Sequence, residues 1–489
     1  MADSITTQAN LSASKASIRS KLQEVWGYSD FRSPQAEIIE ALLQKRDAIA
    51  ILPTGGGKSL CFQLPALMQT GVTLVISPLV ALMENQVQDL HQRQLPAALL
   101  HSELPKNQYR QTLWALENQR LRLLYLSPET LLSPKVWQVL CQPQQSINGL
   151  ILDEAHCLTQ WGETFRPAYF RLGAVRRSLL QHQPPGMQIP IAAFTATADQ
   201  SVQQTIQHIL HLQQPYLVRL NPYRANLHLT VNIAWTPQQR KQKLLNFIRV
   251  RTGQSGLVYV RTRQDSEDLS TWLSQAGFQT AAYHAGLPAQ ERRTIEQGWL
   301  QGTLQFVVCT SAFGMGVNKE NVRWIVHFQV PALLSEYIQE VGRAGRDGKP
   351  AEALALISEP TGWLDPSDKQ RSQFFADQIR KHHQTVLELA PKLPTQGDVA
   401  SVSKQFKQGA IALSLLHSMG CLEWTDPFHY VITQKPSLSK LSKAHTTAPQ
   451  QMHRYLHTKS CRWQFLLNAF GTASEPQNFR CGHCDNCKP

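Results

Sequence analysis

Residues 51–61 read Ile-Leu-Pro-Thr-Gly-Gly-Gly-Lys-Ser-Leu-Cys, an apolar run that ends in a glycine turn and continues into a helix-compatible segment. Glycines let backbone N–H groups point at phosphate oxygens, and the N-terminus of the following helix adds positive potential. The stretch predicts a phosphate-binding loop, with Lys58 on the β/γ-phosphates and Ser59 on Mg²⁺. A glycine-rich turn beside a surface lysine is the alternative, since the usual pattern has glycine at the position of Leu52. The predicted cradle consists of Thr54, Gly55, Gly56 and Gly57.

The charge of the chain suggests a polyanionic partner. The 489 residues include 48 Lys and Arg against 35 Asp and Glu, a net charge of +13. This surplus favours nucleic acid, although many basic proteins only carry solvated lysines. Because no run of 18 apolar residues and no apolar signal core is found, we expect a cytoplasmic protein with a disordered tail at 1–20.

Apolar strand-like runs alternate with helical patterns in two successive units. In the unit 21–213 the runs lie at 48–52, 73–77, 121–126, 149–152 and 189–194. In the unit 214–358 they lie at 255–260, 279–283, 304–309, 324–328 and 351–357. The alternation predicts an α/β fold with two tandem parallel sheets wrapped by helices, joined by a linker near 219–228.

The pattern changes after residue 358. The segment 359–450 is predicted to be a linker and an insertion, with a polar helical stretch at its start. An amphipathic helix at 408–419, capped by Gly420 and followed by a hairpin at 421–432, gives the minimum outline of a winged helix. A small structural insertion explains the same pattern equally well. Residues 451–489 are expected to form a small helical domain with a cysteine cluster.

Two adjacent carboxylates follow the apolar run 150–152, in the order Asp153-Glu154-Ala155-His156. A carboxylate at a strand end can bind Mg²⁺, and its neighbour can orient and deprotonate the attacking water. We assign Asp153 to Mg²⁺ and Glu154 to the general base, and we expect His156 to couple neighbouring motifs. The position downstream of a phosphate loop makes a surface acidic pair the poorer interpretation.

Residues upstream of the loop are candidates for holding the nucleotide base. Gln35 offers a donor and an acceptor, which suit the edge of adenine, and Tyr28 and Arg32 could stack on its faces. An ordinary helix start with buried aromatics explains these residues equally well.

The second unit offers cationic charge for the transition state of phosphoryl transfer. Residues 339–348 read Gln-Glu-Val-Gly-Arg-Ala-Gly-Arg-Asp-Gly, and a helix here would put Arg343 and Arg346 on one face. Across a cleft between the two units both arginines could reach the γ-phosphate. Surface salt bridges are the alternative, which the spacing does not exclude.

Three of the nine cysteines cluster at Cys481, Cys484 and Cys487. In a sequence that shows no export signal, such clustering favours a metal over disulfides. Two successive Cys-x-x-Cys turns deliver three thiolates, and a tetrahedral structural zinc site requires a fourth ligand. His483 is one candidate, although it lies inside a two-residue spacer.

The chain resembles the RecQ family of DNA helicases, within helicase superfamily two, over residues 21–358 and 451–489. The superfamily tolerates a non-glycine at the position of Leu52. The resemblance implies RecA-like domains, and it implies Cys461 as the fourth zinc ligand ahead of His483. It rests on Trp26–Gln35 (adenine recognition), Ser77–Met83 (strand tracking), Phe194–Ala198 (coupling), Ala312–Lys319 (distinctive of the family) and Gln339–Arg346 (arginine supply).

The segment 157–167, Cys-Leu-Thr-Gln-Trp-Gly-Glu-Thr-Phe-Arg-Pro, resembles the aromatic-rich loop of the same family. Trp161 and Phe165 can stack on the bases of a single strand, and Arg166 can meet phosphate or base. Two core aromatics with a capping arginine would explain the same residues if the resemblance were set aside.

The resemblance implies an ATP- and Mg²⁺-dependent DNA helicase that moves 3′ to 5′ and acts in recombination, repair or replication. Its partners would be single-stranded and duplex DNA, with a single-stranded-DNA-binding protein as a further candidate. Because the family's duplex-binding winged helix is expected after the zinc module, we hypothesise that the insertion at 397–445 replaces it. An RNA helicase and a non-enzymatic, zinc-stabilised nucleic-acid-binding protein are the alternatives.

Overall fold

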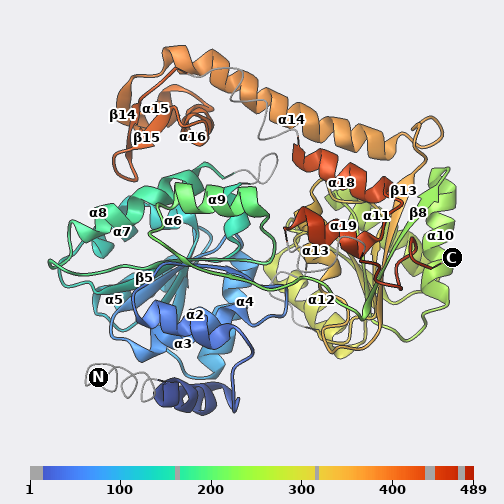
Figure 1. The fold of residues 1–489 in the computed structure, drawn as a ribbon, viewed down its shortest axis with the longest axis horizontal. Coiled ribbons are helices and arrows are strands. Elements are labelled where there is room, and N and C mark those ends of the chain that lie inside the picture. Colours follow the sequence, from blue (N-terminus) through green and yellow to red (C-terminus); the bar gives the residue numbers. More distant parts are fainter. Residues whose placement is uncertain (1–14, 160–165, 314–318, 436–446, 472–478, 489) are drawn as a thin grey trace.

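The computed structural model describes residues 15–159, 166–313, 319–435, 447–471 and 479–488. Two helix-wrapped parallel sheets lie beside each other, and a small module is held over the first of them by a long helix, α14 (Figure 1). The expected fold class, two tandem RecA-like α/β domains followed by a helical cysteine-containing domain, is confirmed. Among the described helices, none is long and apolar enough to cross a membrane.

The first sheet has seven strands in the order β3-β4-β2-β5-β6-β1-β7, all of them parallel. Five of these strands lie where the apolar runs predicted them. The phosphate loop follows β1, and the paired carboxylates follow β5. Because only β6 lies between these two parallel strands, the loop and the carboxylates lie near each other at the same edge of the sheet. The strands are β1 (Ala48–Ile51), β2 (Val72–Ile76), β3 (Ala97–Leu100), β4 (Leu123–Leu126), β5 (Ile147–Leu152), β6 (Ile191–Thr195) and β7 (Tyr216–Arg219).

Helices cover both faces of this sheet, whose strands are buried runs of aliphatic residues. Such runs need cover on both sides, which the crossover helices of a parallel sheet provide. The helical elements are α2 (Gln35–Leu43), α3 (Lys58–Met68), α4 (Val80–Gln92), α5 (Lys106–Glu117), α6 (Pro128–Leu131), α7 (Pro134–Leu140), η1 (Ala155–Leu158), η2 (Pro167–Ala174), α8 (Val175–Leu180) and α9 (Gln200–Ile209).

The second sheet has six parallel strands in the order β10-β11-β9-β12-β13-β8. Its strands are β8 (Leu227–Ala234), β9 (Gly256–Tyr259), β10 (Thr280–Tyr283), β11 (Phe306–Cys309), β12 (Trp324–His327) and β13 (Ala351–Ser358). Its helices are α10 (Pro237–Arg249), α11 (Arg263–Gln275), α12 (Ala289–Gln301) and α13 (Leu334–Val341).

The boundary between the two units differs from the predicted one. The strand β7, placed in the second unit by the sequence, pairs with β1 in the first sheet, and β8 begins within the expected linker. The connection is therefore limited to 220–226. Both strands escaped prediction because they lie at sheet edges, where alternating exposed residues break the apolar runs.

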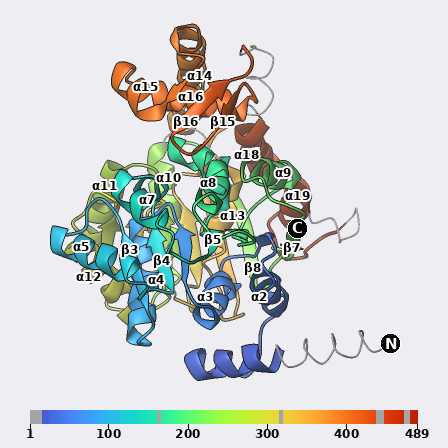
Figure 2. The same ribbon diagram turned by 90° about the vertical axis from the view of Figure 1, so that its left-hand side faces the viewer.

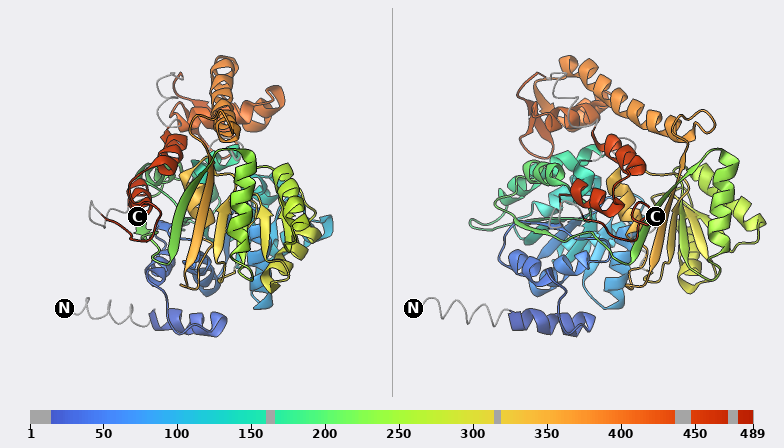
Figure 3. Two further views of the ribbon diagram at one scale, coloured as in Figure 1. Left: turned by 90° about the vertical axis from the view of Figure 1, so that its right-hand side faces the viewer. Right: turned by 45° about the vertical axis from the view of Figure 1, so that its right-hand side comes forward.

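The segment after β13 forms α14 (Ser367–Leu389) and a small module, residues 390–435, called here the insertion module. After α14 its elements follow the order strand, helix, helix, strand, strand, which is that of a winged helix, one of the two alternatives that the sequence left open. Figures 2 and 3 show it seated over the first unit, with α14 leading to it from the second. It contains η3 (Ala390–Lys392), β14 (Gln396–Asp398), α15 (Val399–Gln405), α16 (Gly409–Ser418), β15 (Leu422–Trp424) and β16 (His429–Ile432).

Two further predictions need correction. The helix α16 is not amphipathic, because its residues Ala412–Leu416 are all buried, between α14, α15 and η2. Residues 15–20 are not disordered: they belong to a helix over 15–26, in which Ile18 and Leu22 are buried against α2 and α3.

Candidate functional site

The phosphate loop has the turn and the helix start that the sequence predicted. Gly55 and Gly57 have φ angles of +85° and +72°, values at which glycine carries no steric penalty. A Cβ added to Gly57 would lie 2.2 Å from the amide nitrogen of Gln35, so a larger residue there would displace the Gln35 side chain. Lys58 and Ser59 are the first residues of α3, which places both at the positive end of a helix that begins beside the loop.

The paired carboxylates lie opposite this loop at the end of β5. The Nζ atom of Lys58 is 3.3 Å from Oε1 of Glu154, and both side chains are 14% exposed. Burial would raise the pKa of the Glu154 carboxyl, but the charges of Lys58 and His156 outweigh it and hold that pKa well below its usual range. Burial and the neighbouring Glu154 raise the pKa of Asp153. Within the described residues no cationic side chain forms an ion pair with the buried Asp153, which fits the Mg²⁺ position assigned to it.

The side chains of Lys58, His156 and Gln339, which come from three different elements, meet at Glu154. Nδ1 of His156 lies 3.3 Å from Oε2 of Glu154 and 3.0 Å from the hydroxyl of Thr195, at the end of β6. From the second unit, Gln339 of α13 donates from Nε2 to Oε2 of Glu154 at 3.2 Å. The expected coupling role of His156 is consistent with these contacts. The contribution of Gln339 was missed, because nothing in the sequence indicates which helix faces the carboxylates.

The arginine segment does not form the helix on which a shared face of Arg343 and Arg346 would depend. The helix α13 ends at Val341, and Gly345 has a φ of +60°, so Arg343 and Arg346 lie in successive turns and not on one helical face. Arg346 still reaches the first unit, since a Cβ added to Gly55 would lie 3.6 Å from its Cδ. Burial and the charge of Arg343 lower the pKa of Arg346 to about 10, which leaves it charged at neutral pH.

The interdomain connection holds this arginine segment in place, a role that the sequence did not indicate. Arg224 donates to the carbonyls of Gly342 and Gly345, and Asn226 donates to the carbonyl of Gly345 at 2.8 Å. A Cβ on Gly345 would lie 2.6 Å from the Asn226 amide nitrogen. The turn that presents Arg346 therefore depends on contacts from a segment more than 100 residues earlier in the chain.

Of the three residues proposed to hold adenine, two contact the phosphate loop. The amide nitrogen of Gln35 lies 3.4 Å from the carbonyls of Gly56 and Gly57, and its oxygen accepts from the backbone N–H of Arg32. Arg32 also donates to the carbonyl of Gly55. Tyr28 is 56% exposed. Gln35 thus supports the loop directly.

Of the predicted strand contacts, Trp161 and Phe165 lie outside the described residues. Arg166 forms a bidentate ion pair with Glu129, and it donates to the carbonyl of Pro78 at 2.5 Å. Its guanidinium thus connects the aromatic-rich segment to the Ser77–Met83 segment at the carboxyl edge of the first sheet.

The four predicted zinc ligands converge. The sulfur atoms of Cys461, Cys481, Cys484 and Cys487 all lie within 4.8 Å of one another, and those of Cys481 and Cys487 are 3.9 Å apart. Four sulfurs at about 2.3 Å from a zinc ion in a tetrahedron have nearly this spacing.

The surroundings of the sulfurs also suit a structural zinc site. Backbone N–H groups of Cys481 and Arg462 donate to the sulfurs of Cys461 and Cys484, as they do to metal-bound thiolates. His483 is not in the group and instead contacts the Tyr223 hydroxyl. The donor set therefore fits Zn²⁺.

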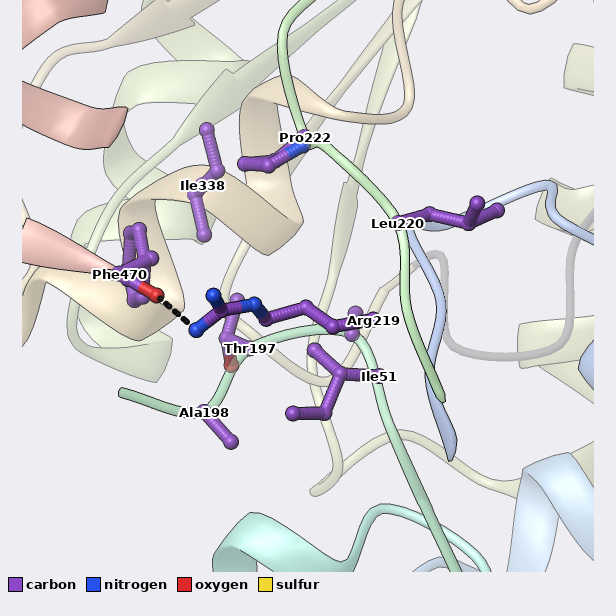
Figure 4. A pocket seen from close by; sticks show the side chains of 9 residues that line it. Ile51, Thr197, Ala198, Arg219, Leu220, Pro222, Ile338 and Phe470 are labelled. Carbon is purple, nitrogen blue, oxygen red and sulfur yellow. Dashed lines mark hydrogen bonds between the residues drawn. The ribbon is translucent and has the colours of Figure 1, made fainter. Parts of the chain in front are cut away.

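The helical cysteine-containing domain contacts both α/β units. On the second, Asp485 accepts from the backbone N–H of Val231 in β8. Towards the first, Arg219 at the end of β7 donates to the carbonyl of Phe470, just after α19 (Arg462–Ala469). Figure 4 shows this junction, a small pocket that Thr197 and Ile338 also line. The other helix of the domain is α18 (Thr447–His457), which packs on α13.

Replacement of Cys484 by serine is expected to remove bound zinc and lower the unfolding temperature, because one of the four ligands is lost and the stability that the metal adds to the domain is lost with it. Zinc content measured by atomic absorption, with a thermal unfolding curve, checks both effects. The matched control is His483→Ala, which should keep one zinc per chain. Stoichiometric zinc in Cys484→Ser would contradict the four-cysteine site.

Comparison with family models and curated proteins agrees with this geometry. The chain matches the models "DEAD/DEAH box helicase" over 32–205, "Helicase conserved C-terminal domain" over 239–348 and "RecQ zinc-binding" over 427–488. It is 49% identical over 479 residues to the ATP-dependent DNA helicase RecQ of Synechocystis sp., covering 97% of this chain and 99% of the relative. It is 33% identical over 482 residues to the probable ATP-dependent DNA helicase RecS of Bacillus subtilis, covering 96% and 92%. With RecQ of Haemophilus influenzae the identity is 38%, and the match spans 58% of that longer protein.

Solved structures share the fold at low identity. The helicase MrfA bound to DNA superposes with a TM-score of 0.58 at 17% identity, over 87% of this chain and 59% of that chain. The helicase Lhr of Mycobacterium smegmatis, bound to single-stranded DNA and AMP-PNP, gives 0.56 at 17% identity, over 86% and 60%. These similarities support the two-unit architecture.

Proposed function

The chain belongs to the RecQ family of ATP-dependent DNA helicases, and from this premise we propose that it moves 3′ to 5′ along single-stranded DNA. We propose further that the strand stimulates ATP hydrolysis, that Mg²⁺ is required, and that the enzyme serves recombination, repair or replication in the cytoplasm. The observation that carries the proposal is the meeting of Lys58, Glu154 and Gln339 at one point between the two units. A site built from both units changes whenever the units move relative to each other.

The proposed cycle assigns each group a task. The loop and Lys58 hold the phosphates, while Ser59 and Asp153 would hold Mg²⁺, which would neutralise charge on the phosphate oxygens. Bound ATP draws Lys58 away from Glu154, which leaves the carboxylate free to accept a proton from the attacking water. Arg346 supplies positive charge to the γ-phosphate from the second unit, and Arg343 is the second arginine proposed for this task.

Hydrolysis then releases the grip between the units. Lys58 of the first unit and Arg346 of the second both contact the γ-phosphate in this proposal. Loss of that phosphate removes the anion that holds the two units together, so the cleft can open. The DNA strand would be held at the carboxyl edges of both sheets. Alternate closing and opening of the cleft between the units would then advance the enzyme along the strand. Arg166 is proposed to exchange its ion pair with Glu129 for a phosphate or base, and Trp161 and Phe165 to stack on bases.

Two assays test the proposal. ATP hydrolysis with and without single-stranded DNA should show a strong stimulation by the strand, and forked duplexes should be unwound only when they carry a 3′ tail. Absence of stimulation would favour a non-enzymatic binding protein, and unwinding of RNA in place of DNA would favour an RNA helicase.

The adenine assignment has its own test. Replacement of Gln35 by alanine is expected to raise KM for ATP about tenfold, as the loss of one to two hydrogen bonds implies. Steady-state kinetics with ATP and GTP measures it, because loss of adenine recognition should erase the preference for ATP. The control is Gln44→Ala, an exposed residue at the end of the same helix. If the variant hydrolysed ATP more slowly but still preferred ATP to GTP, Gln35 would support the loop and would not recognise adenine.

A further inference from the structure

The insertion module contacts the first α/β unit through α16 and through the β15–β16 hairpin. In helix-turn-helix proteins the second helix enters the major groove, and here that helix is α16. It packs along η2, where the Ser414 hydroxyl donates to the carbonyl of Pro167 at 3.1 Å. Beside it, the rings of His417 and Phe170 meet edge to face, 6.2 Å apart. A duplex could not occupy this face while the contact persists.

The tip of the β15–β16 hairpin is held as well. Arg171 of η2 donates from Nε to the carbonyl of Pro427 at 2.6 Å, and its guanidinium lies over the ring of Phe428. Arg177 of α8 donates to the carbonyls of Trp424 and Thr425. Carbonyl groups at a turn are ready acceptors, and a charged donor makes the stronger kind of hydrogen bond.

The element held in this way carries the strand arginine. Arg166 immediately precedes η2, and its guanidinium links Glu129 to Pro78 at the carboxyl edge of the sheet. Ala174, at the other end of η2, is buried in the core of the insertion module. Both ends of η2 are therefore held in place. Glu129 and Pro78 hold the Arg166 end, and the core of the insertion module holds the Ala174 end.

We propose that the insertion module is a brace that positions η2, and with it Arg166, for the DNA strand. Arg171 and Arg177 are the positioning residues of this brace. The chain leaves the second unit through α14, docks on the first unit, and returns through α18, which packs on α13. The brace therefore ties the strand contact of the first unit to the unit that supplies Arg346. This role differs from the duplex-binding wing expected from the sequence.

The inference rests on the proposed stimulation of ATP hydrolysis by single-stranded DNA, and it is tested with Arg171→Ala, Arg177→Ala and the double variant in the full-length protein. We expect basal hydrolysis without DNA to be unchanged. The oligothymidylate concentration for half-maximal stimulation should rise about tenfold or more, as loss of positioning implies. Duplex affinity should stay the same. Arg380→Ala is the matched control, an exposed arginine on α14 that pairs with Asp377 of the same helix.

Each outcome decides between the roles. If wild-type protein is stimulated and the variants respond equally well, the brace is wrong. Tighter duplex binding or faster unwinding in the variants would also overturn it, and would show that docking masks a duplex-binding surface. Absence of stimulation in the wild-type protein would instead contradict the proposed function. Arg177 is exposed, so its variant should fold even if Arg171→Ala does not, and Arg177→Lys should restore part of the response.

Discussion

Replacement of Glu154 by glutamine is expected to lower kcat for ATP hydrolysis by about 10²–10⁴-fold, the usual contribution of a positioned general base. Glutamine keeps the size of the side chain, and its single carbonyl oxygen can accept from Lys58 or from Gln339, but it cannot accept a proton. ATP should therefore still bind. Single-turnover hydrolysis, together with binding of a fluorescent ATP analogue, separates the two effects.

The control for this variant is Glu117→Gln, a change of the same chemistry at an exposed position on α5. It should hydrolyse ATP at the wild-type rate. If Glu154→Gln retained more than about a tenth of wild-type kcat, the proton would have to leave by another route. The assignment of the general base would then be wrong.

Replacement of Arg346 by alanine is expected to have an effect of similar or greater size, about 10³-fold or more on kcat, as for arginine fingers in other phosphoryl-transfer enzymes. The side chain lies against Gly55 of the phosphate loop, and its pKa near 10 leaves it charged. Loss of its charge removes stabilisation that exists chiefly in the transition state, so KM for ATP should change little.

Three companion variants make this second test specific. Arg346→Lys should recover only part of the rate, because an ammonium lacks the planar fork of a guanidinium. Arg249→Ala, at an exposed position near the end of α10, should behave as wild type. If Arg343→Ala proves as damaging as Arg346→Ala in kcat, the two arginines act together. If Arg346→Ala alone lowered kcat by less than tenfold, Arg343 would be the arginine that stabilises the transition state.

The parts of the site that could be predicted are those whose chemistry is local. A glycine turn followed by Lys58 and Ser59 needs only its own backbone to form a phosphate cradle. Asp153 and Glu154 follow an apolar strand directly, and three of the four cysteines lie within seven residues. Each of these patterns is complete within a few residues, so it can be recognised before the chain is folded.

The parts that could not be predicted depend on which distant segments meet. Gln339 bonds to Glu154 across 185 residues, and Arg224 holds the turn of Arg346 across 121 residues. No helix continues through Arg346, because Gly345 takes a left-handed conformation that Asn226 and Val322 hold by hydrogen bonds. A helix period in the sequence carries no information about such contacts.

For this chain, the sequence by itself determined the two α/β units, the nucleotide loop with its carboxylates, and the cysteine cluster. Short-range patterning suffices there, because buried parallel strands, phosphate cradles and metal turns each impose their own local composition. Tertiary structure alone decided how the units share one ATP site and where the insertion module docks. The physical reason is that complementarity between surfaces, such as η2 against α16, depends on shape and burial that no single segment contains.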